Sequence, residues 1–342
     1  MLCSHLAGSE NLFQKSSRSS VTPLLESTGC RHTAKAFEAS PADHATLRGT
    51  NVDIGRIGIW TAQFDQQPWA AVAADAAELD ERGYGALWIP EARGREVLAQ
   101  AALLLGATQR IAVASGIAVI YARDAVAMAA GQRTLCEAFP GRFLLGIGIS
   151  HRPIVEGLRG HAYGPPLTEM RTYLDAMDAA PYVPPRAAEE PRVLAALGPK
   201  MLALARDRAA GAHPYFVPAE HTRRAREILG PGPLLAPELA VVLEPDLQRA
   251  REIARRHTLP YLERENYVNN LRRLGYGDDL ADGGSDRLVD ALVGWGSLDD
   301  VVGRVQAHLE AGADHVCLQV LPSDPAVLPR REWRELAAAL LG

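Results

Sequence analysis

The sequence lacks long apolar runs and is poor in lysine and cysteine, which argues against several classes of protein. No uninterrupted apolar run approaches the roughly 18 residues of a membrane span, so we expect no membrane segment. Lysine occurs only as Lys15, Lys35 and Lys200, and the net charge is −5. This charge gives no reason to expect nucleic acid as a partner. We expect a small molecule as the partner instead.

Cysteine is also scarce, with Cys3, Cys30, Cys136 and Cys317 and no Cys-x-x-Cys pair. We expect buried thiols in a reducing cytoplasm rather than disulfides. No pair of His or Cys has zinc spacing, so no metal site is predicted. The sequence contains no G-x-S-x-G, so a hydrolase triad has no support.

Residues 1–52 differ from the rest of the chain. They are rich in Ser, Thr and mixed polar residues, and no helical or strand period persists in them. We expect a poorly ordered N-terminal extension, or a translated leader upstream of the true start. No basic segment is followed by an apolar one, so a secretory signal is not expected. Residues 53–342 are predicted to form one domain.

From residue 55 onward, short apolar runs alternate with helical patterns. Strands are predicted at 56–60, 86–89, 111–115, 142–149, 192–196, 211–215, 238–243 and 315–320. Helices are predicted at 69–82, 96–107, 125–138, 167–179, 200–209, 219–229, 298–311 and 332–341, with a helical insertion over about 246–293. Eight apolar strands with helical crossovers predict a (β/α)8 TIM barrel, with the insertion between strands 7 and 8. An open doubly wound sheet is the competing architecture.

Active sites of such barrels lie at the C-terminal ends of the strands. Three side chains after the first strand are predicted to contact substrate: Gln63, Phe64 and Asp65. The alternative is a polar loop with Asp65 near the next helix. After the second strand, Glu91 is placed to act as a general acid or base. The alternative for Glu91 is an ion pair with Arg93 or Arg123.

The third and fourth strands end in glycine and small polar residues. Gly116 follows Ser115 and would let the backbone approach a flat cofactor closely. Gly148 belongs to a G-x-G that lacks the third glycine and the helix of a dinucleotide fingerprint, so a Rossmann site is rejected. Ser150 and His151 offer a hydroxyl and an imidazole at the barrel mouth, although a single histidine is often structural.

The fifth strand leads into Gly198, Pro199 and Lys200. A proline at the first helical turn, free N–H groups and a nearby cation predict an anion site at this helix start. The alternative is a plain helix start. After the sixth strand, His213 places another imidazole at the rim.

At these residues the chain resembles the luciferase-like oxidoreductases, and closely a subgroup assigned to coenzyme F420. The matching stretches are 78–91 (ELDERGYGALWIPE), 141–151 (GRFLLGIGISH), 192–215 (RVLAALGPKMLALARDRAAGAHPY), 267–274 (YVNNLRRL) and 312–316 (GADHV). The likeness spans roughly residues 55–341, and the order of the motifs makes it specific. It does not cover the N-terminal extension.

The resemblance implies a homodimeric barrel with an insertion and a deazaflavin at the strand ends. In this family the third strand commonly ends in a bulge with a non-proline cis peptide, which would press on the central ring; Ser115, Gly116 and Ile117 match it. A wall of the cofactor pocket is matched by Gly148, Ser150 and His151. The segment that holds the cofactor phosphate is matched by Leu197, Gly198, Pro199, Lys200 and Met201. A nearby contact is matched by Ala212 and His213.

The sequence also departs from the pattern of the subgroup. F420-dependent sugar-phosphate dehydrogenases carry an Asp-His pair where this chain reads Glu91-Ala92, and a Glu where it has Ile149. Their substrate and proton-transfer scheme therefore do not carry over, and Glu91 or His151 would supply the acid or base. We expect hydride transfer between F420 and a small organic substrate. The alternatives are an FMN-dependent luciferase-like monooxygenase and a non-catalytic deazaflavin-binding protein.

Overall fold

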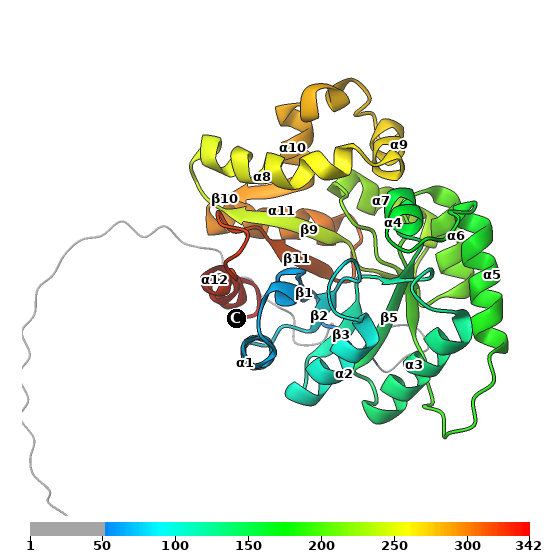
Figure 1. The fold of residues 1–342 in the computed structure, drawn as a ribbon. Coiled ribbons are helices and arrows are strands. Elements are labelled where there is room, and N and C mark those ends of the chain that lie inside the picture. The colour runs from blue at the N-terminus through cyan, green and yellow to red at the C-terminus, as the bar shows by residue number, and fades with distance from the viewer. Residues whose placement is uncertain (1–51) are drawn as a thin grey trace, which may run out of the picture. The chain divides into compact units, whose positions relative to one another are not determined.

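The computed structural model describes residues 52–342, which form a ring of parallel strands with helices around its outside (Figure 1). The predicted extension lies outside the described residues except for Val52, and so do Cys3 and Cys30. Cys136 and Cys317 are buried free thiols, as expected. Within the described part, none of the helices combines the length and apolar character that a membrane crossing requires.

Alternating strands and helices run through the whole described part. The strands are β1 (Ile57–Trp60), β2 (Ala86–Ile89), β3 (Ala112–Ser115), β4 (Ala118–Val119), β5 (Phe143–Gly148), β6 (Arg192–Leu194), β7 (Gly211–Ala212), β8 (Leu234–Leu235), β9 (Glu238–Leu243), β10 (Val293–Gly296) and β11 (Val316–Val320). The first helices are η1 (Gln63–Gln66), α1 (Trp69–Glu81), α2 (Val97–Ala107), α3 (Ala125–Ala138), α4 (Arg152–Gly157), α5 (Pro166–Ala179), α6 (Pro199–Arg208) and α7 (Ala219–Leu229). The insertion holds α8 (Leu247–Leu262), α9 (Glu265–Arg273), η2 (Asp278–Gly283) and α10 (Asp286–Leu292), and α11 (Leu298–Glu310) and α12 (Arg330–Leu340) complete the chain.

The seventh barrel strand is divided at Pro237 into two parts, and each part pairs with a different neighbour. These two pairings close the ring of strands. The first part, β8, pairs with β7, and the second part, β9, pairs with β11. Around the break, the Glu238 N–H donates to the Pro214 carbonyl at 2.9 Å, and the Pro237 carbonyl accepts from the Cys317 N–H at 3.0 Å. The segment is therefore hydrogen-bonded on both sides, and every strand pair is parallel, as a (β/α)8 barrel requires.

The structure differs from the sequence prediction at several places, including the short strands β4 and β8, which were not predicted. The insertion ends in a strand, β10, which adds to the outer edge of β9 and is too short and glycine-rich to stand out in the sequence. The sixth strand stops at Ala212, because Pro214 has no N–H and Phe216 takes a left-handed φ of 59°. The short helix α4 follows His151 and was not predicted.

Local sequence accounts for the ends of several helices. The Asp124 carboxylate accepts the Ala127 N–H at the start of α3. Ser297 and Asp300 form a reciprocal capping box at the start of α11. Gly230, with a φ of 69°, ends α7 in a conformation that favours glycine. Local side chains and glycines thus fix where these helices begin and end, by binding free backbone N–H groups or by allowing a left-handed φ.

The inside of the barrel holds two tryptophans among small residues. Trp88 stacks on His213 with ring centroids 4.3 Å apart, and its indole N–H donates to His315 Nε2 at 3.1 Å. His315 Nδ1 in turn donates to the Gly55 carbonyl at 2.9 Å. Burial lowers the pKa of both histidines to about 4, so both imidazoles are neutral near pH 7.

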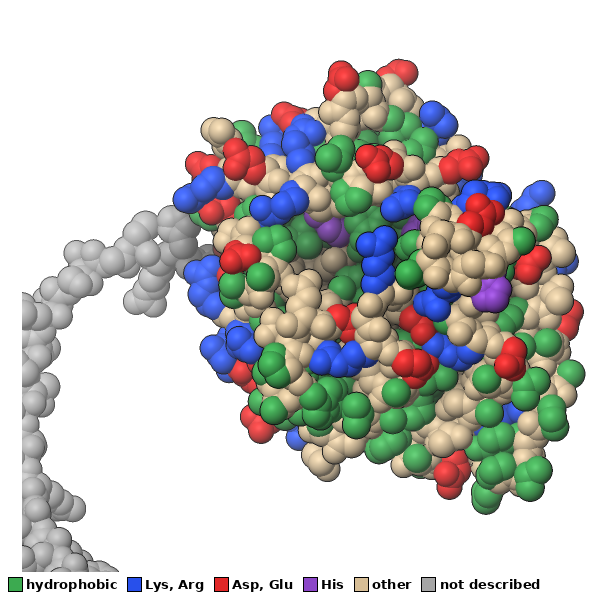
Figure 2. All heavy atoms as spheres, in the orientation of Figure 1, with side chains coloured by type: hydrophobic (Ala, Val, Ile, Leu, Met, Phe, Trp, Pro, Cys, Tyr) green, Lys and Arg blue, Asp and Glu red, His purple; other side chains and the backbone are tan. Residues whose placement is uncertain are grey.

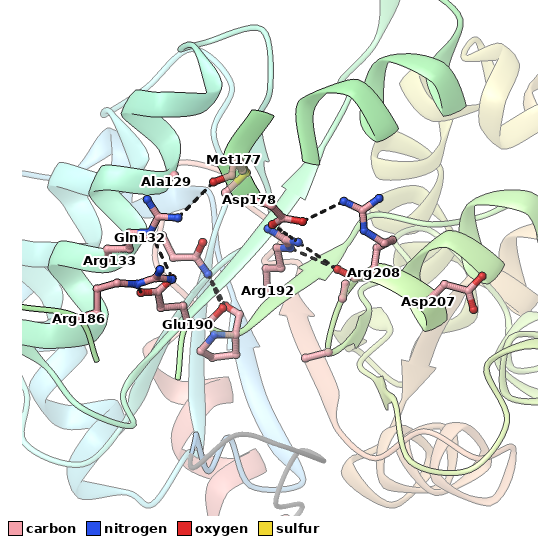
Figure 3. A pocket seen from close by; sticks show the side chains of 13 residues that line it. Ala129, Gln132, Arg133, Met177, Asp178, Arg186, Glu190, Arg192, Asp207 and Arg208 are labelled. Carbon is pink, nitrogen blue, oxygen red and sulfur yellow. Dashed lines mark hydrogen bonds and ion pairs between the residues drawn. The ribbon is translucent and has the colours of Figure 1, made fainter. Parts of the chain in front are cut away.

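A cavity of about 550 Å³ opens between α3, α5 and α6, near the amino end of β6 (Figure 3). Glu190 pairs there with Arg133 and Arg186, and Asp178 pairs with Arg192. Barrel active sites lie at the carboxyl ends of the strands, so this cavity lies at the opposite end from the expected active site.

Glu238, the first residue of β9, is a carboxyl group buried inside the protein. Its Oε2 accepts the Phe216 N–H at 3.0 Å, and its Oε1 has no partner among the described residues. Burial raises the pKa of Glu238 to about 8, because no cation lies close enough to stabilise the carboxylate. The group is therefore mainly protonated at pH 7, with its proton on Oε1.

Replacing Glu238 by Gln should change how stability depends on pH. The folded-state pKa of about 8 lies above the ordinary value of 4.5, so the proton's contribution to stability is present below pH 4.5 and is lost as pH rises to about 8. Gln has no such proton. The melting temperature of Glu238→Gln, relative to wild type, should therefore rise by several degrees between pH 5 and pH 8, as measured by calorimetry.

The matched control is Glu81→Gln, which changes an exposed carboxyl at the end of α1. Its melting profile should run parallel to that of wild type over the same pH range. A parallel profile for Glu238→Gln would contradict the raised pKa.

Candidate active site at the carboxyl ends of the strands

A backbone bulge at the end of β3 forms the floor of the site. The Ser115 hydroxyl donates to the Gly146 carbonyl at 2.8 Å and accepts the Gly146 N–H at 2.9 Å. The next peptide bond, between Gly116 and Ile117, is cis. The Gly116 carbonyl accepts the Trp60 indole N–H at 2.9 Å.

Glycines let two strands approach closely beside this bulge. A Cβ atom on Gly146 would lie 2.0 Å from the Ser115 carbonyl oxygen, and one on Gly148 would lie 2.7 Å from Ile117 Cδ1. Neither side chain fits without displacement, so the Ile117 side chain rests directly against the β5 backbone. The structure therefore brings together Ser115, Gly116, Ile117 and Gly148, as predicted neighbours.

His213 lies directly below the bulge. Its Nδ1 donates to the Ala236 carbonyl at 2.7 Å, so Nε2 carries a lone pair and has no partner among the described residues. A Cβ on Gly116 would lie 3.1 Å from that Nε2. Ala212, the last residue of β7, is fully buried beside it. Both predicted contacts thus lie at the strand end.

Ser150 and His151 follow β5 at the mouth. Ser150 has a left-handed φ of 66°, and its carbonyl accepts from the Tyr163 hydroxyl at 3.5 Å. The His151 ring lies 5.5 Å from the Tyr267 ring of α9. Burial and the nearby charge of Arg264 lower the pKa of His151, so its imidazole is mainly neutral at pH 7.

Helix α6 begins at the same end of the barrel. Gly198 is its N-cap, Pro199 opens the first turn, and no side chain caps the free N–H groups. The Leu197 carbonyl before the cap accepts the His221 Nε2–H at 2.9 Å. Lys200 is exposed and has no carboxylate partner among residues 52–342, whereas Met201 packs partly against the core. The anion site at this helix start stays a prediction.

Glu91 makes the ion pair that the sequence offered as its alternative role. Its Oε1 and Oε2 both contact the Arg123 guanidinium, and Oε2 also accepts the Val119 N–H at 2.8 Å. Both carboxylate oxygens are therefore engaged. The residue ties the end of β2 to β4, just past the bulge.

The three side chains predicted to bind substrate after β1 are held by other loops. Phe64 is fully buried and packs edge-on against Trp333 of α12, so it cannot face a substrate. The Gln63 side chain donates to the Val327 carbonyl at 3.1 Å, and Asp65 Oδ1 accepts the Arg95 N–H at 3.2 Å. We therefore leave Phe64 out of the substrate site.

An aromatic cluster above the bulge was missed by the sequence reasoning. Trp60 of β1 lies 5.2 Å from Tyr215, which in turn lies 5.4 Å from Tyr261 and 6.3 Å from Tyr267 between ring centroids. The Tyr261 hydroxyl donates to Tyr215 at 2.8 Å, and Tyr215 donates to Gln319 Oε1 at 2.7 Å. These rings come from the barrel and from the insertion, so no single periodic pattern contains them. The sequence signal that could have indicated part of this cluster is the presence of aromatic residues at the ends of predicted strands.

The face below α8 and α9 is hollowed (Figure 2). Hydrophobic side chains and a histidine lie in the hollow, and Lys or Arg side chains lie at its edge. Such a slot suits a flat ring, with polar groups confined to its ends. No group of three or more His, Cys, Asp or Glu among the described residues is arranged to hold a metal ion.

Known proteins share this architecture. The chain is 31% identical over 120 residues to a Mycobacterium tuberculosis protein named as a coenzyme F420-dependent oxidoreductase. That match covers 35% of this chain and 33% of the relative, so the chain spans about a third of the relative's length.

Three solved structures resemble it across most of the chain. An F420-dependent secondary alcohol dehydrogenase with an F420–acetone adduct has a TM-score of 0.66 at 15% identity, covering 84% of this chain and 98% of that one. The coenzyme F420-dependent tetrahydromethanopterin reductase of Methanopyrus kandleri gives 0.64 at 16%, with the same coverages. The FMN-bound oxygenating constituent of 3,6-diketocamphane monooxygenase from Pseudomonas putida gives 0.59 at 18%, covering 83% and 96%.

A family model decides the assignment. The model described as luciferase-like monooxygenase matches residues 55–315, which is well over half of the chain. The match contains the bulge, the start of α6 and the insertion. The chain therefore belongs to the luciferase-like monooxygenase family.

Proposed function

We propose that the protein is a coenzyme F420-dependent oxidoreductase that transfers a hydride between the deazaflavin and a small organic substrate. The observation that carries the proposal is the pairing of two subsites at one end of the barrel. One is an apolar slot floored by Ile117, and the other is the uncapped helix start at Gly198. A flat ring suits the first and a phosphate suits the second.

The predicted residues divide between these subsites. The ring would rest against Ile117, with Gly148, Ser150 and His151 as one wall. The buried Ser115, Gly116, Ala212 and His213 would support this floor from beneath. The phosphate would lie at Leu197, Gly198, Pro199, Lys200 and Met201. When bound, the deazaflavin supplies a carbon that accepts or releases hydride. The chain supplies position, uncharged surroundings and exclusion of water.

F420 is favoured over FMN by the names of the relatives. The Mycobacterium relative and two of the similar structures are named for F420. Deazaflavin reacts poorly with oxygen, so the cofactor suits a dehydrogenase or reductase. The second candidate, an FMN-dependent monooxygenase, is favoured by the family description and by the FMN-bound neighbour.

The proton that accompanies hydride transfer needs a donor or acceptor. The sequence offers Glu91 and His151, and the ion pair of Glu91 with Arg123 leaves it fully engaged. We assign Glu91 to positioning the bulge. The half-buried, neutral imidazole of His151 is the better acid–base group, because it accepts a proton from a hydroxyl and returns it to a carbonyl.

Titration of the purified protein with F420 and with FMN tests the cofactor. The Kd for F420 is measured by quenching of deazaflavin fluorescence, and the Kd for FMN by flavin fluorescence. The Kd for F420 should be at least tenfold lower than that for FMN. Tight FMN binding without F420 binding would replace the first proposal by the monooxygenase.

His151→Ala should lower kcat at least tenfold with F420 and a panel of secondary alcohols and enones. The affinity for F420 should change less than threefold, because the ring would keep its other contacts. The control is His161→Ala, which changes an exposed histidine in the loop after α4. Unchanged turnover by His151→Ala would exclude this role.

We also propose that the chain works in the cytoplasm as a homodimer, following its family resemblance. Exposed Leu103 on α2 and Val126 on α3 offer apolar contact at neighbouring helices. Sedimentation velocity at micromolar concentration should show a species of twice the chain mass. A monomer throughout would refute the dimer.

A further inference from the structure

Helix α9 of the insertion faces the amino end of α6. Arg273 Nη2 lies 3.7 Å from the position that a Cβ on Gly198 would occupy. The Arg273 carbonyl accepts the Arg224 Nη1–H of α7 at 2.6 Å, and the Tyr276 hydroxyl donates to Glu220 Oε1 of α7 at 3.2 Å. The end of α9 is thus fixed to α7 by groups other than the Arg273 side chain.

Asn270, one turn earlier on α9, carries an unused hydrogen-bond donor. It is 2% exposed, and its Oδ1 accepts from Arg273 Nη2 at 3.4 Å. Because a guanidinium group only donates, the amide oxygen must face it, which leaves Nδ2 at the other corner of the amide. Nδ2 has no acceptor among the described residues. A buried N–H group without an acceptor is costly, so it indicates a ligand oxygen at this place.

Positive charge gathers at the same place without acidic partners. Lys200, Arg224 and Arg273 form no ion pair with any carboxylate of residues 52–342. The charges of Arg273 and Arg224 add to burial in lowering the pKa of His221, which remains neutral and holds the Leu197 carbonyl. The helix dipole of α6 contributes positive potential in the same direction.

We propose that Arg273 and Asn270, together with the amino end of α6, form one site for the phosphate group of the bound cofactor. The insertion then holds the cofactor's tail, while the barrel holds its ring. Because Gly198 has no side chain, the Arg273 guanidinium lies close beside the amino end of α6, and both could donate to one phosphate. This inference rests on the proposed function and adds two residues to it.

The experiment compares two deazaflavins on the full chain. One is F420, and the other is the same ring with its ribityl chain but without the phosphate. Fluorescence titration should show that Arg273→Gln weakens F420 binding at least tenfold while changing the affinity for the phosphate-free compound less than twofold. Asn270→Asp, which places a carboxylate beside the phosphate, should weaken F420 binding further. Arg273→Lys, which keeps the charge, should give an intermediate loss.

The matched control is Arg272→Gln, at the neighbouring arginine, which is exposed and whose side chain donates to Asn269 Oδ1 at 3.5 Å. It should bind both compounds as wild type does. Inorganic phosphate should compete with F420 on wild type and compete more weakly on Arg273→Gln. Melting temperatures check that each variant is folded. If Arg273→Gln is not folded, Arg273→Lys takes its place in the comparison of the two deazaflavins.

Equal losses for the two deazaflavins, or no loss for either, would overturn the phosphate site and leave the proposed function standing. An equal effect of Arg272→Gln would also overturn it, by showing general electrostatic attraction. Wild-type protein that binds neither deazaflavin would overturn the proposed function, and the phosphate site with it.

Discussion

The break of the seventh strand at Pro237 is the constraint on which the active-site end of the molecule depends. Every barrel strand must be hydrogen-bonded on both edges, and Pro237 has no N–H to give. Its segment meets this demand by pairing first with β7 and then with β11. Beyond the break, the free edge of β9 accepts β10, which returns from the insertion. The helices of the insertion are thereby attached at the mouth of the barrel.

The second property of this site is that its charges cancel or stay at the rim. His213 and His315 are neutral because they are buried, and Glu238 keeps its proton for the same reason. The unpaired cations stand at the amino end of α6 instead. A hydride moves most easily where few charges need to reorganise, so this distribution suits the chemistry proposed.

The sequence rhythm was sufficient to predict the barrel, because parallel strands buried on both faces read as continuous apolar runs. The family resemblance implied the bulge at residues 115–117, and Gly198 and Pro199 marked the start of α6. The sequence was not sufficient where a residue's environment depends on contacts between distant parts of the chain. Phe64 looked like a mouth residue by position, yet its ring packs against Trp333. Glu238 read as the polar start of a strand, and its burial depends on Phe216 and Cys317, which are far apart in the chain.

The aromatic cluster and Asn270 were missed for a related reason. Trp60, Tyr215, Tyr261 and Tyr267 come from separate elements, so only the folded chain makes them neighbours. Glu91 had two interpretations that the sequence could not separate, since the distance to Arg123 is a tertiary quantity.

Helix α9 gives the site a fixed length. Its N-cap, Arg264, lies near His151 at the ring end, and its last residue, Arg273, lies beside Gly198. Nine helical residues span about 13 Å, at 1.5 Å each. In the binding mode proposed above, α9 therefore sets the distance between the reacting ring and the phosphate. Adding or removing one turn of α9 would select for cofactors by the separation of ring and phosphate, independently of the chemistry of either end.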